Sequence, residues 1–123
     1  MVYGGLGRHV HAIAQTQAAL GFDVTVITQA ADGASPDEVV NGVRVLRVSP
    51  DAPYVPLDEE HLLAWVAGFN SAVARAGIRL MRTWKPQVVH GHDWLVAHAA
   101  AVIKEAARIP YVTTMHATEA GRH

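Results

Sequence analysis

The sequence predicts an α/β fold with a Rossmann-like, doubly wound parallel sheet in a three-layer αβα arrangement. Short β-branched runs alternate with longer segments whose apolar residues recur at helical spacing. Strands separated by helices require crossover connections, which are typical of parallel sheets. Residues 43–48 are apolar on both sides of the expected strand, as in a sheet that is covered on both faces. A length of 123 residues suits one domain with one core.

The N-terminal half is expected to hold one helix and two strands. The glycine-rich residues 4–7 predict a tight turn, and a helix should follow over residues 8–20. Residues 23–28 form a β-branched run that predicts a strand, and residues 43–48 predict a second. Residues 30–40 contain Asp, Gly, Ser and Pro and are expected to form a loop.

The C-terminal half is expected to alternate helix and strand. A long amphipathic helix is predicted over residues 59–84, ending before Pro86 because a residue that precedes proline avoids the helical region. Strands are predicted at residues 87–90 and 111–115, with a helix over residues 94–108 between them.

Both ends of the chain are expected to be incomplete. In doubly wound folds a glycine-rich turn joins the first strand to the first helix, so residues 1–3 would be all that remains of a missing first strand. Backbone groups left unpaired and buried beside it would cost about 1–3 kcal/mol each, against a total stability of about 5–15 kcal/mol. The sequence therefore predicts a fragment that is unstable alone. The end at His123 follows directly on a polar motif.

Composition excludes several classes of protein. A net charge of −1 gives no concentrated basic face for nucleic acid. The absence of cysteine excludes disulfides and thiolate metal sites. No apolar run approaches the roughly 20 residues that span a bilayer, and the N-terminus lacks the pattern of a secretory signal. A soluble, cytoplasmic protein without integral membrane contact is expected.

Three polar clusters stand where the chain is expected to leave a strand. The glycines of residues 4–7 precede a helix whose N-terminus suits a phosphate, and a plain tight turn without a ligand is the alternative. Residues 88–94, VVHGHDW, place two histidines and an acid at a strand end, where a histidine can contact a sugar hydroxyl or simply stabilise the turn. Residues 113–123, TTMHATEAGRH, form a third polar cluster at the end of a predicted strand, and the alternative is a solvated loop.

A zinc site is a less favoured alternative for the histidines. His90 and His92 match the start of a hydrolase pattern, but Trp94 and Leu95 occupy its later ligand positions. His116 would have to join the two to complete a zinc hydrolase site. We expect no metal and no cofactor.

The three clusters YGGLGRHV, VVHGHDWL and TTMHATEAGRH, in this order, resemble the N-terminal domain of GT-B retaining glycosyltransferases. The likeness covers nearly the whole chain and is greatest to glycogen synthase-like and sucrose synthase-like enzymes. It implies that residues 1–123 are part of the acceptor-side Rossmann-like domain, and that a C-terminal donor-binding domain is absent. The implied reaction moves a sugar from a UDP-, ADP- or GDP-sugar to a sugar, glucan, lipid or other acceptor.

The resemblance also implies roles for individual residues. It makes His92 the catalytic histidine, which contacts the transferred sugar near its reacting centre, and it makes Asp93 a residue that holds the turn or touches acceptor. The other implied substrate-binding residues are Gly4, Gly5 and Gly7 against the donor diphosphate, and His116, Thr118 and Glu119 along the cleft.

One position departs from the glycogen synthase pattern. Bacterial glycogen synthases carry a lysine two residues ahead of the Gly-Gly pair, where this chain has Val2. This favours broader relatives of the same group, with Arg8 as a local helper for the donor's charge. A non-catalytic nucleotide- or sugar-binding module on the same fold remains the alternative, since a doubly wound sheet serves many functions.

Overall fold

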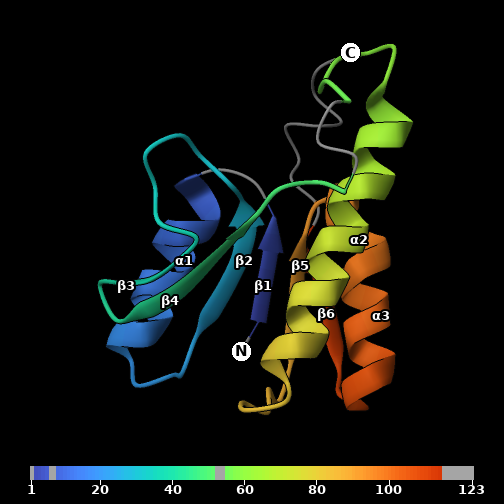
Figure 1. Ribbon diagram of the computed structural model, residues 1–123. Helices are drawn as coiled ribbons and strands as arrows, with labels where there is room; N and C mark the ends of the chain where they lie inside the picture. The colour runs from blue at the N-terminus through green and yellow to red at the C-terminus, as the bar shows by residue number, and fades with distance from the viewer. Residues whose placement is uncertain (1, 6–7, 52–54, 115–123) are drawn as a thin grey trace.

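The computed structural model describes residues 2–5, 8–51 and 55–114, which form one six-stranded sheet with helices packed against it (Figure 1). The strand order is β3-β4-β2-β1-β5-β6, and all neighbours are parallel except β3 and β4. In chain order the elements are β1 (Val2–Gly5), α1 (Arg8–Ala19), β2 (Thr25–Gln29), β3 (Asp37–Val40), β4 (Val43–Val48), α2 (Leu62–Leu80), β5 (Val89–His92), the 3₁₀ turn η1 (Trp94–Val96), α3 (Ala97–Ala107) and β6 (Tyr111–Thr114).

The helices cover both faces of the sheet, as the sequence predicts. Val26 of β2 lies in a core cluster with Val10 and Ala14 of α1, whereas Ile27 lies in a second cluster with α2 and α3. Successive side chains of a strand point to opposite faces, so these two clusters lie on opposite sides of the sheet. This confirms the three-layer αβα, doubly wound architecture. None of the helices in the described ranges is both long enough and apolar enough to cross a bilayer.

The prediction of a missing first strand is wrong for the described residues. Residues 2–5 form β1 at the centre of the sheet, where Gly4 pairs with Ile27 on one side and with Gly91 on the other. The sequence analysis assigned Gly4 and Gly5 to a turn because glycine favours turns. Two flanking strands offer hydrogen-bond partners that outweigh this local preference. The sheet is therefore continuous, and the stated reason for instability no longer holds.

The loop expected over residues 30–40 contains an additional strand. β3 pairs antiparallel with β4 through a two-residue turn at Asn41 and Gly42, both with positive φ, which is the chemistry of a tight hairpin. Arg44 pairs with Asp37 across the hairpin, as Arg47 does with Glu38. The strand was missed because its residues Asp37 and Glu38 are acidic and disfavour a strand in isolation.

Helix α2 is shorter than predicted, and two glycines bring neighbouring segments against it. It spans Leu62–Leu80 instead of residues 59–84, and turns occupy residues 81–83. A Cβ on Gly77 would lie 2.5 Å from Ile103 Cδ1 of α3, and one on Gly68 would lie 2.2 Å from the Asp51 carbonyl oxygen. These two positions therefore need glycine because other atoms approach closely.

Candidate active site at the carboxyl edge of the sheet

The strands that carry the predicted site residues are neighbours in the sheet. β1, β5 and β6 are parallel, so their carboxyl ends lie at the same edge (Figure 1). Gly4 pairs with Gly91, and His92 pairs with Thr114. The fold thus brings Gly4, Gly5 and His92 together at the edge where doubly wound sheets bind their ligands. Gly4 and Gly5 lie within β1 itself and not in the predicted turn.

His92 is held in a stack of two imidazole rings. Its side chain is 2% exposed, and its ring lies 4.3 Å from that of His90, centroid to centroid, at an angle of 20°. His90 Nε2 is hydrogen-bonded to Thr114 Oγ1 at 2.6 Å. The register explains this cluster, because residues that alternate along β5 share a face and Thr114 lies directly across from His92. The His92 ring at the end of β5 is therefore packed against the His90 ring, and a hydrogen bond to Thr114 of β6 holds the His90 ring in place.

Asp93 forms the turn that follows His92. Its φ is +66°, which few residues other than glycine adopt but which Asp tolerates better than most. Its N–H donates a hydrogen bond of 2.8 Å to the Thr114 carbonyl oxygen, which extends the β5–β6 ladder by one residue. This geometry supports the expectation that Asp93 holds the turn. A contact between Asp93 and acceptor stays a prediction.

Several predicted site residues lie outside the described part of the chain: Gly7, His116, Thr118 and Glu119. The zinc alternative needs His116, so it is not tested in full. Among the described residues no group of three or more His, Cys, Asp or Glu side chains is placed to hold a metal ion.

Asn70, which the sequence analysis did not identify, is hydrogen-bonded to the segment that follows His92 in the chain. Its side chain is buried in α2 and donates to the Leu95 carbonyl oxygen at 2.6 Å and to the Val66 carbonyl oxygen at 2.8 Å. Its Oδ1 accepts a hydrogen bond from the Ala99 N–H at 2.8 Å. Ala99 is in the first turn of α3, where N–H groups lack partners within the helix. Asn70 thus joins α2, η1 and α3 just beyond the His92–Asp93 turn.

Burial lowers the pKa of His90 below its ordinary value of 6.5. The folded chain therefore binds this proton less readily than the unfolded chain does. We expect the contribution of His90 to the free energy of unfolding to be constant above about pH 6.5. This contribution should decline as the pH falls from about 6.5 toward the lowered pKa. Denaturant melts between pH 5 and 8 measure this dependence, and His90→Gln should make it shallower.

A matched variant and an NMR titration separate the contribution of His90 to this pH dependence from that of other histidines. His11, whose pKa is lowered by burial and then by the nearby positive charge of Arg47, acts in the same direction, so His11→Gln is the matched variant. An NMR titration of the His90 ring should give a midpoint below 6.5. A midpoint at or above 6.5, with an unchanged pH dependence in His90→Gln, would contradict the assignment.

The chain is similar to known proteins over nearly its whole length. The family model described as "Glycosyl transferase 4-like domain" matches residues 4–123. The chain belongs to this family. Its curated relatives include the "Glycogen synthase" of Mycobacterium tuberculosis, which is 44% identical over 134 aligned residues covering 100% of this chain and 32% of the relative.

Other relatives of this glycosyl transferase 4-like chain carry different names. The "D-inositol 3-phosphate glycosyltransferase" of Frankia alni is 32% identical, with 92% of this chain and 28% of the relative covered. An "Uncharacterized glycosyltransferase" of Methanocaldococcus jannaschii is 34% identical, with 98% of this chain and 29% of the relative covered. The chain thus spans about a third of the length of the curated relatives it matches.

A solved structure supports the fold. Sucrose-phosphate synthase from Thermosynechococcus elongatus superposes with a TM-score of 0.71 at 18% identity, covering 99% of this chain and 66% of that chain. Such a low identity speaks for the fold alone. The superposition agrees with the predicted Rossmann-like architecture of the sheet and its helices.

Proposed function

We propose that this chain is the acceptor-side domain of a retaining glycosyltransferase that moves a sugar from a nucleotide-sugar donor to a carbohydrate or lipid acceptor. The observation that carries the proposal is the buried His92 at the carboxyl edge, one strand away from Gly4 and Gly5. Two relatives of the chain are named as glycosyltransferases, which supports the class of reaction. The polypeptide that performs the reaction would contain a donor-binding domain in addition to these residues.

Each group at the edge has a distinct part in this proposal. The backbone of Gly4 and Gly5 carries no side chain to obstruct a ligand, so a diphosphate can approach the N-terminal end of α1, whose partial positive charge attracts it. The His92 ring, shielded from water, would make a hydrogen bond to the transferred sugar that is stronger than the same bond in bulk solvent. His90 and Thr114 are positioning residues that fix the His92 ring.

The reaction is tested with the polypeptide that includes both domains. UDP-, ADP- and GDP-sugars are each offered with a glucan, a trehalose-type sugar, an inositol phosphate or a lipid acceptor, and product is measured by mass spectrometry. We expect transfer from one donor, with the anomeric configuration retained. The residues of this chain alone should transfer no sugar, because the donor site lies mainly in the other domain.

The alternative is a non-catalytic nucleotide- or sugar-binding module. It predicts saturable binding of a nucleotide or sugar with no transfer from any donor. Inversion of the anomeric configuration would instead contradict the retaining mechanism while leaving the class of enzyme intact.

A further inference from the structure

A groove lies between β4 and the C-terminal half of α2, and its lining does not include His92. Its cavity of about 410 Å³ falls within the range of small-molecule sites. It is bordered by Arg44, near the start of β4, and by Thr83, just after α2. Arg44 lies near the amino end of β4, whereas His92 lies at the carboxyl end of the parallel strand β5, with β2 and β1 between these two strands. The arginine-rich end of the groove and His92 therefore lie toward opposite ends of the strands.

The floor of the groove is apolar. Val43 and Val45 of β4 point to the α1 face, so the alternate residues Leu46 and Val48 face the side of α2. Leu80 of α2 completes this surface. Leu46 and Val48 remain partly exposed because α2 does not fully cover this part of the sheet. The exposed apolar floor suits the carbon skeleton of a ligand.

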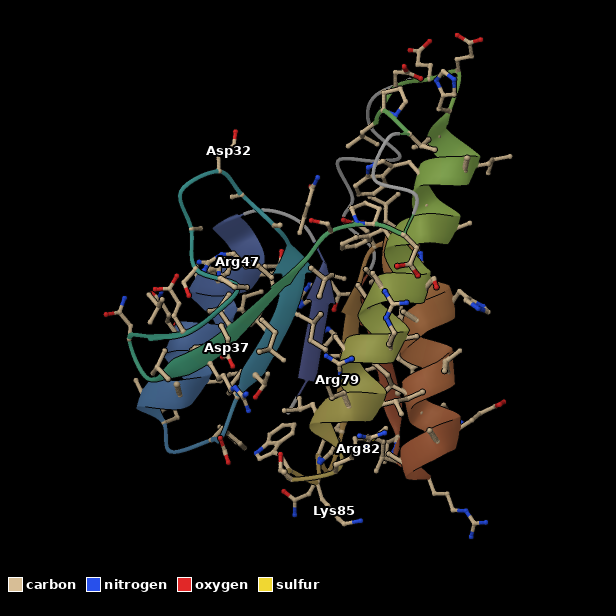
Figure 2. All side chains as sticks on the ribbon, in the orientation of Figure 1. Asp32, Asp37, Arg47, Arg79, Arg82 and Lys85 are labelled. Carbon is tan, nitrogen blue, oxygen red and sulfur yellow. The ribbon has the colours of Figure 1, made fainter. Side chains whose placement is uncertain are left out.

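The charged residues that line the groove are four arginines and one acid: Arg44, Arg47, Arg79, Arg82 and Asp37. Arg79 lies in the last turn of α2 and Arg82 follows the end of that helix (Figure 2). Arg44 borders the same groove from β4. Arg79 and Arg82 are both exposed, and neither makes an ion pair within the described ranges. The ion pairs there involve Arg44, Arg47, His61 and Arg75.

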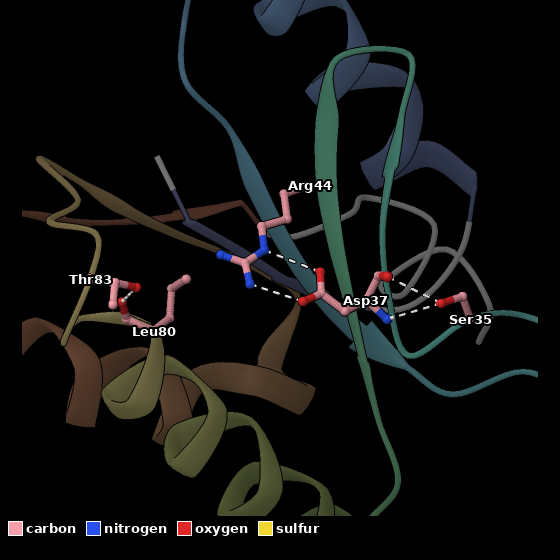
Figure 3. A network of polar contacts seen from close by, with 5 residues as sticks. All are labelled: Ser35, Asp37, Arg44, Leu80 and Thr83. Carbon is pink, nitrogen blue, oxygen red and sulfur yellow. Dashed lines mark hydrogen bonds and ion pairs between the residues drawn. The ribbon is translucent and has the colours of Figure 1, made fainter.

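Arg44 is oriented by its partner toward the groove. Its Nε and Nη2 donate to the two carboxylate oxygens of Asp37, at 3.1 and 2.9 Å, and the remaining nitrogen points away from Asp37 toward Leu80 and Thr83 (Figure 3). The same hydrogen bonds hold the pKa of Asp37 below its usual value. Asp37 and Arg44 thus compensate each other, and the two charges of Arg79 and Arg82 are left over.

Helix stability alone does not explain this arrangement. A cation in the last turn of a helix is favoured by the helix dipole by about 0.3–1 kcal/mol, which accounts for Arg79. That effect does not require a second arginine beyond the helix end or a third on the facing strand. Guanidinium groups are instead the side chains that match the oxygens of a phosphate in paired hydrogen bonds.

We propose that this groove is a second ligand site, which binds a small phosphate monoester with its phosphate on Arg79, Arg82 and Arg44 and its carbon skeleton on Leu46, Val48 and Leu80. The site is separate from the one at the carboxyl edge and does not depend on glycosyl transfer.

Calorimetric titration of the protein with glucose 6-phosphate, inorganic phosphate and glucose tests the proposal. We expect saturable binding of glucose 6-phosphate, weaker binding of inorganic phosphate because it lacks a carbon skeleton, and no binding of glucose. The double variant Arg79→Gln, Arg82→Gln should lower the affinity for glucose 6-phosphate at least 10-fold. The control Lys104→Gln, Arg108→Gln removes two exposed charges from α3 and its end, and should leave the affinity unchanged.

A chemical readout locates the ligand. Glucose 6-phosphate should protect Arg79 and Arg82, but not Arg108, from an arginine-selective dicarbonyl reagent, as measured by peptide mass spectrometry. The His92→Ala variant should bind glucose 6-phosphate as the unchanged protein does.

Four outcomes would overturn the proposal. These are equal losses of affinity in the two double variants, loss of binding in His92→Ala, the absence of saturable binding, and retention on anionic phospholipid vesicles without any response to the soluble phosphates.

Discussion

Replacement of His92 by alanine is expected to lower turnover by roughly 10²–10⁴-fold in a polypeptide that performs the proposed transfer, since the ring would act there as a positioned polar catalyst. The expected effect is large because the His92 imidazole is buried at the carboxyl edge of the sheet. His92 pairs with Thr114 of β6, and its strand β5 is the neighbour of β1, which contains Gly4. Single-turnover kinetics with the donor identified in the screen measures the effect. The loss should fall mainly on kcat, because the proposed contact strengthens as charge develops.

The ring stack provides a matched comparison for His92. His90→Phe keeps an aromatic ring of similar breadth against His92 but removes the hydrogen bond to Thr114 Oγ1. We expect a loss much smaller than that of His92→Ala, and Thr114→Val should resemble His90→Phe. Unchanged turnover in a folded His92→Ala variant would remove this histidine from the mechanism. A loss in His90→Phe equal to that in His92→Ala would assign the larger role to His90.

The largest loss of stability from a polar side chain is expected at Asn70. In Asn70→Ala the Leu95 carbonyl oxygen and the Ala99 N–H both lose their side-chain partner. A buried group left without a hydrogen bond costs about 1–3 kcal/mol, so two such groups cost on the order of 2–6 kcal/mol. This is a large part of the roughly 5–15 kcal/mol that stabilises a typical domain. Urea unfolding followed by circular dichroism measures it.

Two further variants separate the contributions of Asn70. Asn70→Asp keeps the acceptor for the Ala99 N–H but loses the donor to the Leu95 carbonyl oxygen, and it also buries a carboxyl group. The stability of this variant should therefore be nearer to that of Asn70→Ala than to that of the unchanged protein. Ser71→Ala, one residue along α2, removes an exposed hydroxyl from Asp51, which Arg75 also holds, and should cost less than about 1 kcal/mol. Equal stabilities for Asn70→Ala and Ser71→Ala would refute the bridging role.

The fold was predictable where the apolar pattern was long and regular. Helical spacing and β-branched runs predict α1, α2 and α3 and the strands β2, β4 and β6. They also predict β5, but at residues 87–90, two residues before its observed place at Val89–His92. β1 and β3 were not predictable in this way. β1 contains a Gly-Gly pair, and β3 contains adjacent acidic residues, so both depend on partners elsewhere in the chain.

The candidate site was predictable in its position but not in its contacts. Strand ends on neighbouring parallel strands must converge, which placed Gly4, Gly5 and His92 at one edge. The stacking of His90 on His92 and the bond to Thr114 depend on the β5–β6 register, which no local pattern fixes. Asn70 had one signal in the sequence, since it is a polar residue among the apolar residues of α2.

The hairpin of β3 and β4 makes the two borders of the sheet unequal. β3 is short and carries Asp37 and Glu38, and such charges discourage another chain from adding a strand. β6, the opposite border of the described sheet, reads YVTT without a charged residue, and Val112 is 46% exposed. Unwanted self-association of this domain should therefore begin at β6, and a lysine in place of Val112 would be the first substitution to improve its solubility.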